Sequence, residues 1–162
     1  MANQVSEDVE LAAVEGDARK LSEWLTTFQL VTVVLDPYTA ESAWILETAG
    51  RFLTNFRGAD CRVSLTVTAD ATDARKFLGP WADELLAFAD PDRVLVRALG
   101  LERLPALVHI RQDLTVVGAS EGWDPPAWED IGRNLGKVMS WSHPELPQRG
   151  DPGPFEGTRA AG

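Results

Sequence analysis

The chain has 162 residues, enough for one domain with a sizeable buried core. Its formal net charge is −10, which argues against nucleic acid as a partner because a phosphate backbone needs clustered Lys and Arg. No apolar run reaches the ~20 residues that span a bilayer, and residues 1–10 are acidic where a signal peptide is basic. A single cysteine forms no internal disulfide. We therefore expect a soluble, acidic, cytoplasmic protein that binds neither nucleic acid nor membranes.

The first half of the chain alternates between helical and extended patterns. Apolar side chains recur at helical spacing over about residues 9–28, which predicts an amphipathic helix. Residues 30–35 form a short β-branched apolar run, typical of a strand that is buried on both faces. A second helix follows and ends before Gly58. Residues 61–68 alternate between apolar and polar side chains, which predicts a strand with one face not fully buried.

The second half is predicted to be mostly helical until a hairpin near its middle. Residues 72–89 are expected to be helical, with an interruption at Gly79 and Pro80. A short helix opens after Asp90 and ends before Gly100. Two short strands then flank a polar turn around Gln112, and a last helix runs from Asp124 to about Trp141.

Pro105 stands between a predicted helix and a predicted strand, and the order of elements around it is informative. The pattern of helix, proline, strand, turn and strand resembles the C-terminal half of thioredoxin-fold proteins, and the resemblance covers about residues 30–141. It implies an α/β fold with a mixed sheet: parallel strands first, an antiparallel hairpin last, and helices on its faces. We expect a helical N-terminus in place of the family's first strand, which leaves strand 61–68 at a sheet edge. The predicted domain is 1–142, followed by a Pro/Gly-rich extended tail, 143–162.

The redox motif of the family has no counterpart in this sequence. Thr39 and Ser42 stand where thioredoxins carry their cysteine pair, and Val33 stands at the position of a buried acid. A hydroxyl cannot form a disulfide, so dithiol chemistry is not expected. Either hydroxyl could instead stabilise a bound thiol, as in glutathione transferases, or act as a nucleophile with His109 or His143 as base. The simpler interpretation is that both residues only start the helix.

A binding groove beside Pro105 is the site that the resemblance implies. In the thioredoxin fold this proline is cis, and its loop hydrogen-bonds an extended partner peptide. Trp123 follows the second hairpin strand and serves either as a binding anchor or as packing against Trp128 or the tail. The tail is either disordered or docked on the domain, and Phe155 is its expected anchor when docked. Cys61 is expected to be an inert buried thiol. The predicted groove residues are Tyr38, Thr39, Ser42, Leu104, Pro105, Gly118, Ala119 and Trp123.

Our leading expectation is a redox-inactive, adaptor-like or chaperone-like protein that binds a protein or peptide partner. It implies no catalytic residue, no metal site and no cofactor. Two alternatives stay open: an enzyme that uses a thiol cofactor or the hydroxyl of Thr39 or Ser42, and a structural subunit of a larger assembly. A homodimer, if one forms, is expected to use the edge of strand 61–68.

Overall fold

The computed structural model describes residues 3–161 of the chain. In chain order its elements are β1 (Glu10–Ala13), β2 (Ala18–Lys20), α1 (Leu21–Trp24), β3 (Gln29–Leu35), α2 (Ala40–Thr54), β4 (Cys61–Val67), α3 (Ala71–Leu78), α4 (Trp81–Glu84), β5 (Leu86–Ala89), α5 (Val94–Leu99), β6 (Arg103–Leu104), β7 (Ala106–Ile110), β8 (Val116–Glu121), α6 (Pro125–Met139) and β9 (Thr158–Arg159).

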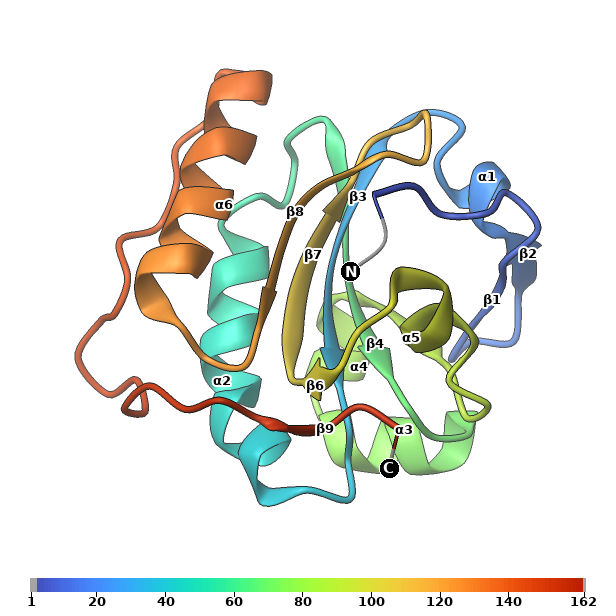
Figure 1. Ribbon diagram of the computed structural model, residues 1–162, viewed down its shortest axis with the longest axis horizontal. Coiled ribbons are helices and arrows are strands. Elements are labelled where there is room, and N and C mark those ends of the chain that lie inside the picture. The colour runs from blue at the N-terminus through green and yellow to red at the C-terminus, as the bar shows by residue number, and fades with distance from the viewer. Residues whose placement is uncertain (1–2, 162) are drawn as a thin grey trace.

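A mixed sheet runs through the molecule in the order β2-β1-β5-β4-β3-β7-β8 (Figure 1). Strands β3, β4 and β5 are parallel to one another, and β7 joins β3 in the antiparallel sense before the hairpin to β8. The two short strands β6 and β9 form a separate antiparallel pair. The expected α/β fold, with parallel strands first and an antiparallel hairpin last, is confirmed.

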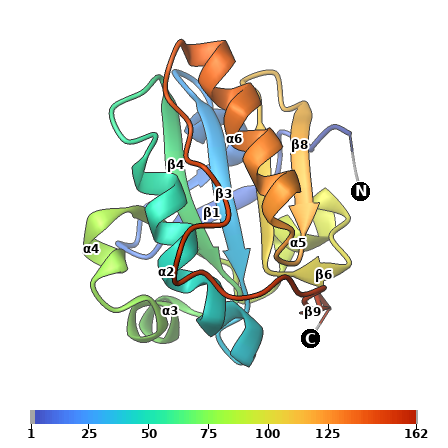
Figure 2. The same ribbon diagram turned by 90° about the vertical axis from the view of Figure 1, so that its left-hand side faces the viewer.

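The sheet separates two apolar cores, because side chains alternate between its faces along each strand. Helices α2 and α6 cover one face (Figure 2). The core on this face holds Phe52 and Trp128 together with Val33 of β3. Helices α1 and α5 cover the other face, together with the N-terminal segment. Within the described residues, no helix is both long and apolar enough to cross a membrane.

The N-terminal helix predicted over residues 9–28 is wrong. The chain instead forms the β1–β2 hairpin and only four helical residues in α1. Gly16 turns the chain at a φ of 101°, and the N–H of Ala13 donates to the carbonyl of Asp17 across the turn. A left-handed glycine inside an apolar pattern is a turn signal, and here it outweighs the helical spacing.

The expected sheet edge at residues 61–68 is also wrong. Strand β4 pairs with β3 on one side and, from Ser64 to Val67, with β5 on the other. Strand β5 lies within the segment 72–89 that was predicted to be helical. The polar side of β4 is buried because its hydroxyls find partners: Ser64 donates to the carbonyl of Val31, and the Thr66 and Thr32 hydroxyls lie 2.8 Å apart. From Ser64 to Val67, the edge that was expected to pair in a homodimer is therefore already paired with β5.

The C-terminal segment crosses one end of the molecule and finishes as β9 beside β6 (Figure 1). It is extended, as its prolines and glycines predict, but it is packed onto the rest of the chain. Leu146 and Ala160 are buried, the first in the core under α2 and α6, the second in the opposite core. The segment thus contributes to both cores.

The paired hydroxyls between β3 and β4 predict a non-additive effect on stability. Thr66→Val leaves the buried Thr32 hydroxyl without its partner, so the free energy of unfolding should fall by about 1–2 kcal/mol. The double change of Thr32 and Thr66 to valine removes both polar groups and should recover most of that loss. Urea unfolding of the two single variants and the double variant measures this. A double variant that loses the sum of the two single effects would contradict the pairing.

Candidate functional site

Strand β3 ends in a polar turn that is organised by Asp36. The Asp36 carboxylate accepts hydrogen bonds from the backbone N–H of Tyr38 (3.0 Å) and from the guanidinium of Arg93 (3.1 Å). The Asp36 side chain is 4% exposed, so the Arg93 ion pair compensates a charge held away from water. Sequence analysis missed both residues. An acid directly after a buried strand is a signal for Asp36, whereas nothing in the sequence distinguishes Arg93.

Thr39 and Ser42 close this turn. The buried Ser42 hydroxyl accepts a hydrogen bond from the backbone N–H of Asp36 (2.9 Å), and the Thr39 hydroxyl donates to the Asp36 carbonyl (3.0 Å). Thr39 is the N-cap residue of α2, although its side chain makes no capping hydrogen bond. Tyr38 is 68% exposed, and its hydroxyl donates to Asp73. That hydrogen bond raises the pKa of Tyr38 above its ordinary value.

The Leu104–Pro105 loop lies at the same end of the sheet as this turn. Val34 of β3 pairs with Ala106 of β7, so the residues just before β7 adjoin those just after β3. The Leu104–Pro105 peptide bond is cis. Both residues are buried, and the Leu104 backbone pairs with Thr158 of β9. The expected groove at this loop is therefore covered by the chain's own C-terminal segment.

Two of the predicted groove residues do not reach the loop. Gly118 and Ala119 pair with His109 and Val108 in the middle of β7, and Gly118 faces Ile131 of α6. The residue that borders the loop is Gly122, whose N–H donates to the carbonyl of Pro105 (2.7 Å). This wall of the groove lies later in the chain than predicted, because Gly118 and Ala119 are inside β8, which extends to Glu121.

Trp123 and Phe155 meet beside the loop. Their backbones exchange two hydrogen bonds, of 2.8 and 3.1 Å, and the Trp123 indole donates to the carbonyl of Pro152 (2.8 Å). Trp123 is buried and packs edge-on against Trp128, with ring centroids 4.9 Å apart. The half-buried Phe155 ring lies edge-on to Trp44 of α2 at 5.7 Å. Trp123 thus both packs on Trp128 and holds the tail, and Trp44 is a contact that sequence analysis missed.

The one thiol and the two imidazoles lie away from this loop. Cys61 begins β4, at the opposite end of the parallel strands, and burial raises the pKa of its thiol to about 11. His109 lies inside β7, its Nε2 is 2.6 Å from the side-chain oxygen of Gln29, and burial lowers its pKa to about 4. His143 lies in the segment after α6. None of the three is positioned to activate Thr39 or Ser42. Across residues 3–161 no cluster of three metal-ligating side chains is found.

Comparisons with known proteins place the fold. No family model matches the sequence, and no match is found among curated proteins. Among solved structures, DsbF of MTB is 12% identical with a TM-score of 0.65, covering 83% of this chain and 98% of that one. A putative thiol:disulfide interchange protein DsbE from Chlorobium tepidum is 16% identical with a TM-score of 0.68, covering 86% and 99%. A mutant PrxQ from Xylella fastidiosa is 14% identical with a TM-score of 0.67, covering 85% and 96%.

The chain has a thioredoxin-like fold. It contains one cysteine in all, so it lacks the redox-active pair, as the sequence predicted. The expectation of a redox-inactive adaptor, however, is wrong. The thioredoxin-like structures that resemble this chain are thiol–disulfide oxidoreductases and peroxiredoxins, which are redox-active proteins, so the likeness lends no support to an adaptor role.

The raised pKa of Cys61 predicts slow alkylation in the folded protein. Only the thiolate reacts with iodoacetamide, so a pKa near 11 in place of 9.0 should slow the reaction at pH 8 by about a hundredfold relative to the urea-unfolded chain. The folded-state rate should then rise about tenfold per pH unit up to pH 10. Mass spectrometry of quenched samples measures both, with Cys61→Ser as the blank. Equal rates in the folded and unfolded chains would contradict the burial of this thiol.

Proposed function

We propose that this thioredoxin-like protein recognises polypeptides in a thiol-based redox system. The recognised segment is extended and binds along β6, beside the loop of Leu104 and Pro105. The observation that carries the proposal is the β6–β9 pair, because an extended segment forms antiparallel backbone pairs with Arg103 and Leu104 directly before Pro105.

The geometry of β6 favours strand addition. Arg103 and Leu104 pair with β9 and with no strand of the main sheet, so their recognition of a chain rests on backbone groups and tolerates many side chains. The carboxylate of Glu121 accepts hydrogen bonds from the backbone N–H groups of Glu102 and Arg103, which steadies the loop from β8. Because β6 offers backbone hydrogen-bonding groups along a strand edge held in place by Glu121, it suits an extended polypeptide better than a compact small molecule.

The thiol-redox setting is supported by the fold's likeness to DsbE, which is named a putative thiol:disulfide interchange protein, and to DsbF, whose structure contains mixed oxidized and reduced forms. Cys61 is unsuited to supply the reacting sulfur at this loop. It starts β4, whereas Thr39 follows the end of the parallel strand β3, and seven strand residues span about 20 Å. The hydroxyls of Thr39 and Ser42 are held by hydrogen bonds to the backbone of Asp36.

A disulfide-exchange experiment tests recognition at the loop. The full chain with Thr39→Cys and Cys61→Ser places one thiol on the turn beside Pro105. A synthetic β-prone peptide, supplied in millimolar excess, carries one cysteine as its mixed disulfide with thionitrobenzoate. The protein thiolate attacks the peptide sulfur, a protein–peptide disulfide forms, and thionitrobenzoate leaves and is read by its absorbance. N-acetylcysteine amide with the same leaving group serves as the small reference.

We expect the ratio of peptide rate to reference rate to be at least tenfold higher for Thr39→Cys than for a matched control. The control is Val138→Cys, also with Cys61→Ser, since Val138 is 61% exposed and lies beside Gln29 at the start of β3, whereas the loop adjoins the end of β3. The ratio cancels differences in thiol pKa between the two positions. Equal ratios at both positions would show that the loop does not recognise an extended chain.

A further inference from the structure

We infer that residues 155–160 are an internal ligand of the β6 edge, and that the partner segment shares their chemistry. The partner is an extended chain with an aromatic residue, a glycine two positions later, and a small residue three positions after that, as in Phe155, Gly157 and Ala160. It binds when it displaces the chain's own tail. This inference rests on the proposed function and names the partner class of the same edge.

The tail follows the edge with backbone hydrogen bonds along its whole length. Phe155 exchanges two bonds with Trp123, β9 pairs with β6, and the N–H of Ala160 donates to the carbonyl of Glu102 (2.9 Å). The Arg103 guanidinium also donates to the carbonyl of Gly157 (3.0 Å). These contacts use the tail's main chain, so another extended segment can reproduce them.

Two side chains of the tail and one backbone contact set the specificity. The Phe155 ring lies edge-on to Trp44, and the Phe155 backbone pairs with that of Trp123. Ala160 is fully buried among the residues packed around α5, so a small apolar side chain suits this position. The Arg93 guanidinium, already paired with Asp36, donates to the carbonyl of Ala160 and links the tail's end to the β3 turn.

Gly157 allows the tail to approach the loop. Its φ is 89°, and a Cβ at this position would lie 2.5 Å from the carbonyl oxygen of Leu104. Gly122 faces it, with a φ of 75° and an added Cβ 2.5 Å from the carbonyl oxygen of Glu156. Two left-handed glycines therefore meet where the tail crosses the loop. A partner segment must carry glycine at the same position to seat there.

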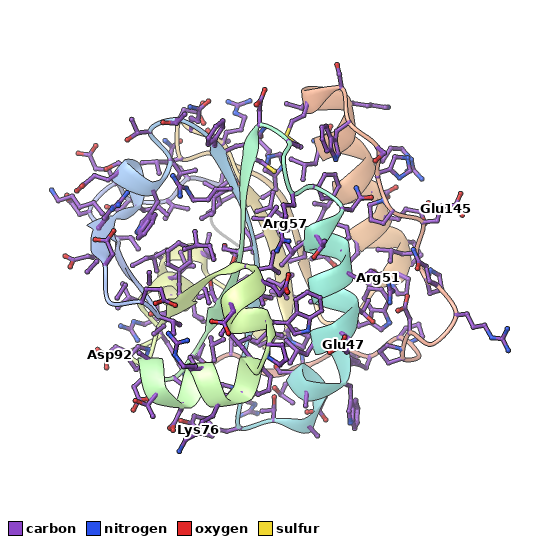
Figure 3. The ribbon with its side chains drawn as sticks, turned by 180° about the vertical axis from the view of Figure 1, so that it is seen from behind. Glu47, Arg51, Arg57, Lys76, Asp92 and Glu145 are labelled. Atoms are coloured by element: carbon purple, nitrogen blue, oxygen red, sulfur yellow. The ribbon has the colours of Figure 1, made fainter. Side chains whose placement is uncertain are left out.

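The tail is held upstream at Asp151, separately from the contacts that residues 155–160 make with the edge. The Asp151 carboxylate is almost fully buried and accepts hydrogen bonds from Thr48 (2.8 Å), from Arg51 and from the Gln148 N–H (2.6 Å). Burial alone would raise the pKa of Asp151, but these bonds outweigh it and hold the pKa below its ordinary value. Figure 3 labels Arg51 and Glu47 along α2, on the side of the helix that lines a hollow with Pro144 and Gln148.

The docked segment leaves open space at both of its ends. A hollow of about 340 Å³ adjoins Phe155, and one of about 130 Å³ adjoins Ala160. A longer partner segment therefore has additional surface to fill, which gives it an advantage over the tail. The tail's own advantage is its tether, which sets an effective concentration on the order of millimolar. A free peptide with the same side chains must therefore compete with the tethered tail for the β6 edge.

Gly157→Val in the full chain tests the inference, because the added side chain would meet Leu104 and expel the tail while leaving the edge intact. Gly153→Val is the matched control, since a Cβ at Gly153 meets nothing within 4 Å. The probe is a fluorescent synthetic peptide with the sequence of residues 152–162, followed by anisotropy. We expect Gly157→Val to bind the probe at least tenfold more tightly than the wild type and Gly153→Val do. The same probe carrying the Gly157→Val change should not bind.

The outcomes separate this inference from the proposed function. Equal affinity in all three chains overturns the tail's role as competitor and leaves polypeptide recognition standing. Absence of binding in all three, with the peptide preference of Thr39→Cys still present, overturns only the partner's chemistry. Absence of both overturns the proposed function as well. A wild-type dimer that Gly157→Val converts to a monomer would identify a second copy's tail as the occupant and overturn the inference.

Circular dichroism and thermal unfolding establish that Gly157→Val is folded before its binding is measured. If it does not fold, Phe155→Ala replaces it, because Phe155 is only half-buried and its loss removes the aromatic anchor without adding a clash. The expected result for Phe155→Ala is the same tighter binding of the unmodified probe. Wild-type affinity in a folded Phe155→Ala chain would overturn the inference.

Discussion

At the end of β3, Asp36 joins three parts of the chain that lie far apart in the sequence. Its backbone N–H and carbonyl bind the hydroxyls of Ser42 and Thr39, which fixes the start of α2. Its carboxylate binds Arg93 ahead of α5, and Arg93 in turn binds the carbonyl of Ala160 at the end of the tail. The buried Asp36 therefore sets the geometry of the turn, and through Arg93 it helps to position the end of the tail.

The positions that carry cysteines in thioredoxins have become structural here. A hydroxyl on Ser42 can accept a strong hydrogen bond from a backbone N–H, which a thiol does only weakly, and the turn is built on that bond. The same end of the sheet is then covered by the tail, with Phe155 against Trp44 and β9 against β6. The loop beside Pro105 thus pairs with the chain's own extended tail, and hydroxyls stand at the turn in place of thiols.

Much of the fold could be predicted because its signals are local. The buried run at 30–35 and the Asp124 cap ahead of α6 both appear as expected. The errors came from long-range effects. The hydroxyls of β4 look solvent-facing in the sequence, yet Thr32 and the Val31 carbonyl satisfy them inside the sheet. The N-terminal hairpin was hidden because its apolar residues happen to repeat at helical spacing around Gly16.

The site was harder to predict than the fold. Leu104, Pro105, Trp123 and Phe155 could be selected from their positions around the predicted hairpin and tail. Arg93 and Trp44 could not, because their roles depend on where the tail docks. The meeting of Gly122 with Gly157 likewise joins residues from two separate segments, and each looks like an ordinary loop glycine in the sequence.

Hydrogen exchange of the tail amides in the full, unmodified chain tests the central claim most directly. The Phe155 and Ala160 amides donate to the carbonyls of Trp123 and Glu102, so both should exchange much more slowly than the neighbouring exposed amide of Gly153. Protection at both positions, read by NMR at neutral pH, is the result that a docked tail predicts. Exchange at the rate of an unstructured chain at Phe155 and Ala160 would contradict it.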